Sequence, residues 1–290
     1  MDAVPGSTTK HSLGVGPGRL VEALRQECRD ARIWQIAALS GLLAWNVAEL
    51  SLGASLVPSL VSVGGALLAQ IVASRLAGLP RIDLRSALIT GLSLSLLLRG
   101  DALWVQALAA ALAIGSKFVI RVRGKHVFNP ATFAIFVLLF TGHAWVTPGQ
   151  WGQSAFIMSA IAFLGILVLT RATRLDIALS FLVAYIGLLF LRAAWLGDPV
   201  AIPLHQAQNG ALLLFACFMI TDPRSTPDAR IARILFALAV AVTAHWLLFF
   251  QQMPSALYAS LMAASLAVPI LDRLFPASRF VWRRPMEVSR

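Results

Sequence analysis

The chain has 290 residues, of which 58% are hydrophobic and 13% are charged, and its formal net charge is +11. This excess of apolar residues excludes an ordinary soluble domain, whose exterior must face water, and it predicts an all-α protein embedded in membrane lipid. The basic residues stand in short runs between apolar stretches, which excludes a nucleic-acid interface, and the cysteines Cys28 and Cys217 form no CxxC motif that would predict a metal or iron–sulfur site.

Apolar stretches follow one another along almost the whole chain. A helix that crosses a bilayer needs about 20 predominantly apolar residues. We expect ten such segments, at 33–53, 55–74, 86–98, 102–119, 130–146, 154–170, 177–196, 208–221, 231–250 and 255–271. The third and the eighth are too short for simple crossings, so we expect them to be half-helices or re-entrant segments buried among the others.

Positive charge alternates between the two sides of these segments. With the N-terminus placed inside, 22 of the 24 lysines and arginines fall in inside loops, and only Arg99 and Arg192 fall outside. This split predicts a multi-pass protein of the bacterial inner membrane with both termini in the cytoplasm.

The order of the segments predicts four parts. Residues 1–32 form a cytoplasmic N-terminal segment, 33–146 and 154–271 form two sets of five helices, and 272–290 form a basic cytoplasmic tail. Because each set has an odd number of helices and a short third member, the sets are expected to be inverted-topology repeats with a binding site at their broken helices. Within the N-terminal segment, 19–30 is amphipathic, which predicts either an interfacial helix that docks a partner or a solvated cap.

Two polar motifs interrupt the apolar pattern on the predicted inner side. The first, Phe128-Asn129-Pro130-Ala131, opens the fifth segment, and its Asn and Pro have the chemistry of a helix start. The second, Thr221-Asp222-Pro223, closes the short eighth segment. Asp222 either pairs with a nearby arginine, Arg224 or Arg230, or binds a cation or a donor-rich cofactor edge beside the broken helix.

The predicted outer side carries fewer candidate residues. Trp145 and Trp151 in the loop at 141–152 are either interfacial anchors or covers for a flat aromatic cofactor. Glu49, near the outer end of the first segment, is a candidate for cation or proton handling, or a carboxylate that simply reaches water. The histidines lie at different predicted depths, which disfavours a haem site.

These motifs, in this order, resemble one family. The run Leu88-Ile89-Thr90-Gly91-Leu92, a long fourth segment that ends in Lys117, then 128–131, 221–223 and Ser225-Thr226-Pro227, is similar to RnfD and NqrB, which are membrane subunits of the Rnf complex and of the sodium-pumping NADH:quinone reductase. The motif order matches over about 84–235. In length the chain resembles short stand-alone members, including those associated with enediyne biosynthetic loci.

The resemblance implies ten helices in two inverted repeats, a flavin (FMN or riboflavin), and electron transfer with partner redox subunits, flavin or iron–sulfur proteins, or a quinone. In many members the outer loop carries Ser-Gly-Ala-Thr, whose Thr bears FMN. Here the corresponding loop reads Ala144-Trp145-Val146-Thr147-Pro148, so Thr147 is kept without Ser-Gly-Ala, and covalent attachment is in doubt. We expect the cofactor site at Phe128, Asn129, Thr221 and Asp222, with Trp145 and Trp151 as ring covers.

Two other classes of function fit the same sequence. An inverted-repeat fold with broken helices suits a solute or ion channel or transporter. A membrane anchor for a redox or biosynthetic assembly would need no site at all. No catalytic residue is assigned from the sequence.

Overall fold

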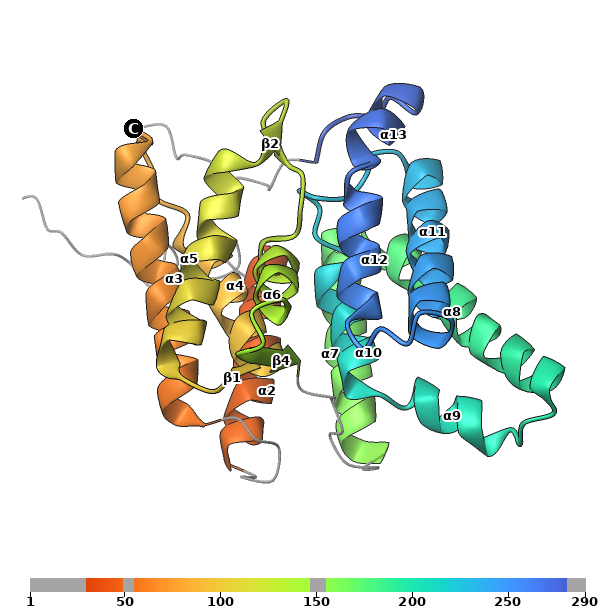
Figure 1. Ribbon diagram of the computed structural model, residues 1–290. Coiled ribbons are helices and arrows are strands. Elements are labelled where there is room, and N and C mark those ends of the chain that lie inside the picture. The colour runs from red at the N-terminus through yellow and green to blue at the C-terminus, as the bar shows by residue number, and fades with distance from the viewer. Residues whose placement is uncertain (1–29, 49–54, 147–154, 281–290) are drawn as a thin grey trace, which may run out of the picture.

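The computed structural model describes residues 30–48, 55–146 and 155–280. Helices dominate this part of the chain (Figure 1). In chain order they are α2 (Ala31–Ala48), α3 (Leu56–Leu76), α4 (Leu84–Leu97), α5 (Leu103–Val119), α6 (Pro130–Leu139), α7 (Ala155–Ala172), α8 (Leu175–Leu196), α9 (Ala201–Ala207), α10 (Gly210–Leu214), the π-helix η1 (Phe215–Met219), α11 (Arg230–Phe249), α12 (Ala256–Ser265) and α13 (Val268–Leu274).

Local sequence accounts for several helix ends. Asp83 accepts a hydrogen bond from the Ser86 amide at 3.3 Å and so caps α4, and Asn209 accepts one from the Ala211 amide at 2.9 Å and caps α10. Gly197 ends α8 in the left-handed conformation, with φ of 73°, where a residue without a Cβ carries no steric penalty. These caps satisfy backbone groups that have no partner within the helix.

The helices fall into two groups that stand side by side in Figure 1. In the first group α3 packs against α4 and α5, and α4 packs against α2. In the second group α8 packs against α11, which packs against α12. The groups meet where α2 contacts α7 and where α6 contacts α12.

The two segments expected to be short are short and buried. Helix α4 has 14 residues, and every residue from Gly91 to its end at Leu97 is buried. The eighth segment is α10 followed by the π-helix η1, and all five residues of η1 are buried. Both elements therefore lie among the longer helices.

Several details differ from the sequence prediction, first in the fifth and tenth segments. The fifth segment is helical only to Leu139. Gly142 (φ 75°) follows, and then strand β4 (Ala144–Val146) pairs antiparallel with β1 (Leu98–Gly100), so backbone that was expected to extend a helix forms a ladder instead. The tenth segment is divided into α12 and α13, which meet at a bend of 46°.

The described part of the chain is thus mostly helical, as expected, with short strand pairs in its connections. A second short ladder joins β2 (Arg121–Val122) to β3 (Lys125–His126) in a hairpin between α5 and α6. Helix α9 lies between the expected seventh and eighth segments, where the sequence predicted no membrane segment. Strands of two or three residues are too short to show an alternating pattern in the sequence, so their pairing could not be predicted.

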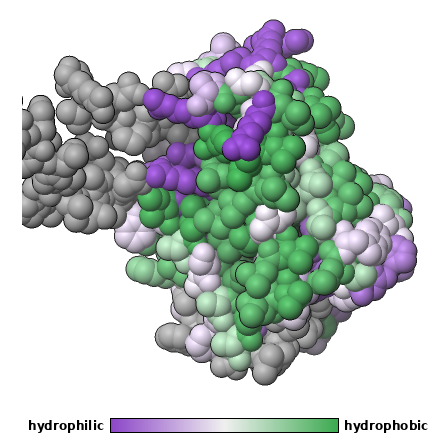
Figure 2. All heavy atoms as spheres, turned by 90° about the vertical axis from the view of Figure 1, so that its left-hand side faces the viewer, coloured by the Kyte–Doolittle hydropathy of each residue, from purple (hydrophilic) through white to green (hydrophobic). Residues whose placement is uncertain are grey.

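The molecule is a helical membrane protein. Among the described residues, α3, α8 and α11 are long and apolar enough to cross a bilayer, and the bent pair of α12 and α13 adds a fourth span if it counts as one. Figure 2 shows a broad hydrophobic surface on the side of α3, with hydrophilic residues gathered towards its upper end.

Helix α3 shows most clearly that lipid surrounds the protein. It buries Ser59, Ser62, Gln70 and Ser74, while Leu60 and Leu68 are about 60% exposed. A helix in water places these residue types the other way round. Small and polar residues inside and leucines outside are typical of packing between membrane helices.

Candidate functional site

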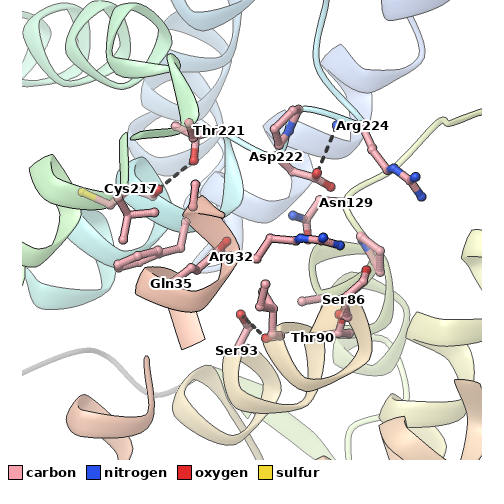
Figure 3. A pocket seen from close by; sticks show the side chains of 18 of the residues that line it. Arg32, Gln35, Ser86, Thr90, Ser93, Asn129, Cys217, Thr221, Asp222 and Arg224 are labelled. Carbon is pink, nitrogen blue, oxygen red and sulfur yellow. Dashed lines mark hydrogen bonds between the residues drawn. The ribbon is translucent and has the colours of Figure 1, made fainter. Parts of the chain in front are cut away.

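A pocket lies between the two groups of helices, which we call the interface pocket. Its walls come from the N-terminal parts of α2 and α6, from the first three turns of α4, from the end of α5, from β3, from α7, and from η1 and the turn that follows it (Figure 3). Its volume is about 70 Å³. The N-terminal parts of α2 and α6 therefore border one small polar space, with polar side chains of α4 beside them.

Asn129 holds the first sequence motif in this wall. Its side-chain oxygen accepts a hydrogen bond from the Thr132 amide at 3.0 Å and caps α6, and Pro130 follows at the first helical position. Its Nδ2 donates to the carbonyl oxygen of Met219 at 3.2 Å, across the junction between the helix groups. Asn129 is therefore both the predicted cap and a bridge between the two halves, and it is only 8% exposed.

The second motif forms a closed turn after η1. The hydroxyl of Thr221 donates to the Cys217 carbonyl oxygen at 2.7 Å. The carboxylate of Asp222 accepts from the Arg224 amide and from the Ser225 hydroxyl, both at 3.1 Å. The carboxylate of Asp222 thus stabilises the turn through a backbone amide and a hydroxyl while it lines the pocket, and both interpretations of Asp222 stay predictions.

Basic side chains complete the wall. Arg32 lies 2.7 Å from a carboxylate oxygen of Asp30 and 3.1 Å from one of Asp83. Lys117, 4% exposed, donates from Nζ to the carbonyl oxygen and the hydroxyl oxygen of Ser86 at 3.2 and 3.1 Å. Arg32 is balanced by Asp30 and Asp83, but Lys117 and Arg224 outnumber the carboxylate of Asp222 in the lining, so the pocket favours negative charge.

Burial and hydrogen bonding change proton affinity at the edge of the pocket. Burial alone would raise the pKa of Asp30, but hydrogen bonds from Arg32 and Arg85 bring it below its usual value. Burial lowers the pKa of His126 to about 4, although Asp222 opposes the shift. His126 is therefore neutral at pH 7.

The structure brings together three of the seven predicted site residues. Asn129, Thr221 and Asp222 line the interface pocket. Phe128 is half-buried beside it and stacks on Phe133, with ring centroids 5.7 Å apart, without entering the lining. Trp145 lies in β4, beyond the other end of α6.

The remaining outer residues form a separate region. Trp145 is 50% exposed and is paired in register with Arg99. Nearby, His143 Nδ1 lies 2.6 Å from a carboxylate oxygen of Asp101. Thr147, Trp151 and Glu49 lie outside the described residues.

Sequence reasoning missed Arg32, Gln35, Ser86 and His126 as pocket residues. Each stands just inside or just outside a predicted span, where polar residues are ordinary. Only the helix packing shows that they converge. Within the part of the chain that the structure describes, no group of three His, Cys, Asp or Glu residues is placed to hold a metal ion.

About half of the chain matches a known protein family. The model of the NQR2, RnfD, RnfE family matches residues 139–281. Residues 139–281 are therefore similar to this family. The matched part includes Thr221-Asp222-Pro223 and Ser225-Thr226-Pro227 and begins after Phe128-Asn129-Pro130-Ala131, so it covers the later motifs of the resemblance to RnfD and NqrB and not the earlier ones.

Individual relatives agree with this family. The chain is 33% identical over 135 residues to the D-subunit of the ion-translocating oxidoreductase complex of Alcanivorax borkumensis, which covers 46% of this chain and 36% of that protein. It is 28% identical over 150 residues to the D-subunit of Citrobacter koseri and 27% over 151 residues to that of Escherichia fergusonii, and each alignment covers 51% of this chain and 40% of the relative. The chain thus spans about two fifths of the length of these relatives.

Proposed function

We propose that this chain is an electron-transport subunit of a membrane oxidoreductase and that its redox group sits at the interface pocket. The observation that carries the proposal is that Asn129, Thr221 and Asp222, from motifs about 90 residues apart, line one polar pocket between the two helix groups. The relatives are named as subunits of an ion-translocating oxidoreductase complex. The partners of this chain would accordingly be other redox subunits, flavin or iron–sulfur proteins, or a quinone.

The helix contacts favour two inverted repeats of five segments in the bacterial inner membrane. Helix α2 contacts α7, and these are the first segments of the two predicted sets. Helix α6 contacts α12, and these are the fifth segments of the two sets. Contacts between equivalent helices are what a pseudo-two-fold axis in the membrane plane produces. A tag on either terminus that is accessible only from the periplasm would contradict the cytoplasmic placement of the ends.

A flavin, FMN or riboflavin, matches the hydrogen-bonding groups that line the pocket, but the volume of the pocket is smaller than a flavin ring. The edge of an isoalloxazine ring presents N–H and carbonyl groups. The amide of Gln35 and the second N–H of Asn129 would serve as donors to it, and the hydroxyl oxygens of Thr221 and Thr90, whose protons are donated to the carbonyls of Cys217 and Ser86, would serve as acceptors. A volume of about 70 Å³ is less than half of a cavity of about 150 Å³ that binds one benzene ring. The pocket in this structure therefore accommodates a ring edge, and a whole ring requires the two helix groups to move apart.

The residues around the pocket have separable tasks in this proposal. A bound flavin would supply one- and two-electron chemistry. Asn129 and Thr221 would orient its polar edge, while Lys117, Arg32 and Arg224 would stabilise the negative charge that arrives with electrons. Because the loop at Thr147 lacks Ser-Gly-Ala, we propose non-covalent binding, and an intact mass increased by one FMN would contradict it.

The test is a visible absorption spectrum of the full-length protein purified in detergent. We expect flavin bands. Asn129→Ala should lower the ratio of flavin to protein, whereas Trp145→Phe, at the other end of α6, should leave the ratio unchanged. Flavin lost from the Trp145 variant and kept in the Asn129 variant would place the cofactor at the outer loop, and a colourless wild-type protein would refute the flavin.

Buried polar atoms in the first helix group favour a second candidate, ion movement, either coupled to electron transfer or as a channel. Asn46 is fully buried, and neither its amide nitrogen nor its oxygen has a hydrogen-bond partner among the described residues. The same holds for Oε1 of Gln106 and the hydroxyl of Thr132. Uptake of sodium or protons by liposomes that contain a colourless protein would support the channel, whereas a colourless and inactive protein that co-purifies with partners would indicate an anchor.

A further inference from the structure

A second cavity lies beside the interface pocket, under the β2–β3 hairpin, and we call it the hairpin cavity. Its volume is about 130 Å³. It is bounded by the hairpin, by Asp228, by α13 and by 276–279. Arg123, Pro276, Ala277 and Arg279 on its rim are exposed, so water reaches it from the surface.

His126 forms the partition between the two spaces, because it lines both the interface pocket and the hairpin cavity. The residue is 5% exposed, and its Nδ1 has no hydrogen-bond partner among the described residues. Buried imidazole nitrogens normally have partners, since leaving one unpaired costs free energy. An unpaired nitrogen between two polar spaces points to a transient partner.

We propose that His126 carries protons from the hairpin cavity to the interface pocket when electrons arrive there. This inference rests on the proposed electron-transport function. The imidazole accepts a proton from water at one ring nitrogen and releases one from the other, so each passage moves one proton and leaves the ring neutral. Histidine is suited to this task because its two nitrogens act as donor and acceptor in turn.

The surrounding charges couple the proton to the electrons. On the pocket side His126 faces Asp222, Arg224 and Lys117, and across the hairpin it is paired in register with Arg121. On the cavity side stand Lys125, Arg123, Asp228, Asp272 and Arg279. The pocket-side cations disfavour a protonated ring at rest, which agrees with a pKa lowered mainly by burial to about 4. Negative charge delivered to the interface pocket offsets them and draws a proton through the ring.

The first test follows reduction of the co-purified flavin by dithionite in the full-length protein, by stopped flow at pH 7. In His126→Gln, which keeps a polar side chain without a titratable ring, we expect the proton-coupled phase to slow at least tenfold and added imidazole to restore it. His143→Gln, an exposed histidine at the outer end, is the matched control and should reduce at the wild-type rate. A His126 variant within twofold of wild type overturns the relay.

A second measurement needs neither flavin nor a variant that folds. In wild-type protein labelled with ¹⁵N-histidine, NMR should show a neutral His126 ring at pH 7 whose N–H exchanges with water. A ring proton protected from exchange overturns the relay even if the flavin is present. A colourless protein refutes the flavin proposal instead, and the exchange measurement then decides on His126 alone.

Discussion

A single lysine ties the hairpin to the second helix group, and its removal should destabilise the protein. Lys125 Nζ lies 2.8 Å from a carboxylate oxygen of Asp272 and 3.1 Å from one of Asp228. The three side chains are 15%, 21% and 8% exposed. In Lys125→Met the stem of the side chain remains, and two neighbouring carboxylates lose the cation between them.

The expected loss in the free energy of unfolding follows from the two carboxylates that remain without their cation. Removing one partner of a buried ion pair costs about 3–5 kcal/mol, and the partial exposure of this cluster places the cost at about 3 kcal/mol. The Asp228 amide still donates to Asp272 Oδ1 at 2.9 Å, which keeps the two carboxylates close. At about 2–4 °C per kcal/mol, the melting temperature should fall by about 6–12 °C.

Thermal unfolding in detergent, followed by tryptophan fluorescence, measures this change. Arg230→Met removes one charge from an exposed arginine of the same region and should shift the midpoint by no more than about 2 °C. Lys125→Met/Asp272→Asn removes one of the carboxylates that face each other and should recover part of the loss. A midpoint of Lys125→Met equal to that of Arg230→Met would refute the reasoning.

Three further changes have defined outcomes. A Cβ on Gly91 would lie 2.8 Å from the Val63 Cα, so Gly91→Ala should lower the free energy of unfolding by about 1–3 kcal/mol. The control is Gly115→Ala, whose Cβ would have nothing within 4 Å and which should leave the free energy of unfolding unchanged or raise it by up to about 1 kcal/mol. Asn129→Asp keeps the cap and loses the donor to Met219, so chemical denaturation should show a loss of about 1 kcal/mol, against about 2 kcal/mol for Asn129→Ala. His126 has its pKa lowered to about 4 by burial, so the unfolded chain binds more protons than the folded protein between about pH 6.5 and 4. The free energy of unfolding should therefore decrease as the pH is lowered through this window. At about pH 4.5 the decrease should be smaller by about 2 kcal/mol in His126→Gln than in the wild type. Parallel curves of unfolding free energy against pH for the two proteins would contradict the lowered pKa.

The sequence predicted the helices well because each one carries its own signal. Apolar runs bounded by charges fixed α3, α8 and α11 to within a few residues, and lipid demands that such runs be helical. Asn129 was predicted as a cap because Asn before Pro satisfies the free amides of a helix start whatever surrounds it. The ten crossings stay a prediction, since the spans identified by length and apolarity among the described residues are fewer.

The sequence predictions fail where the local structure depends on contacts with a segment distant in the sequence. Nothing near Trp145 predicts a strand, because its partner is Arg99 in another loop. Phe128 stands next to Asn129 in the sequence, but it stacks on Phe133 of the helix that follows instead of lining the pocket. His126 is buried among residues distant in sequence, Asp222, Arg224 and Lys117, which no local pattern reveals.

The links between the two helix groups also explain how a pocket of about 70 Å³ can serve a larger ligand. Asn129 donates to the Met219 carbonyl oxygen at the pocket, and Lys125 binds Asp228 and Asp272 just beyond His126. Both links are polar contacts between residues of different halves. The halves also pack directly, α2 against α7 and α6 against α12, so separation costs the burial at these two helix pairs as well as the two polar links. The packing of α3 with α4 and α5, and of α8 with α11, is kept, so separation costs less than unfolding either half. A ligand that replaces the contact of Asn129 can offset that cost, so the residues that close the pocket are also those best placed to open it.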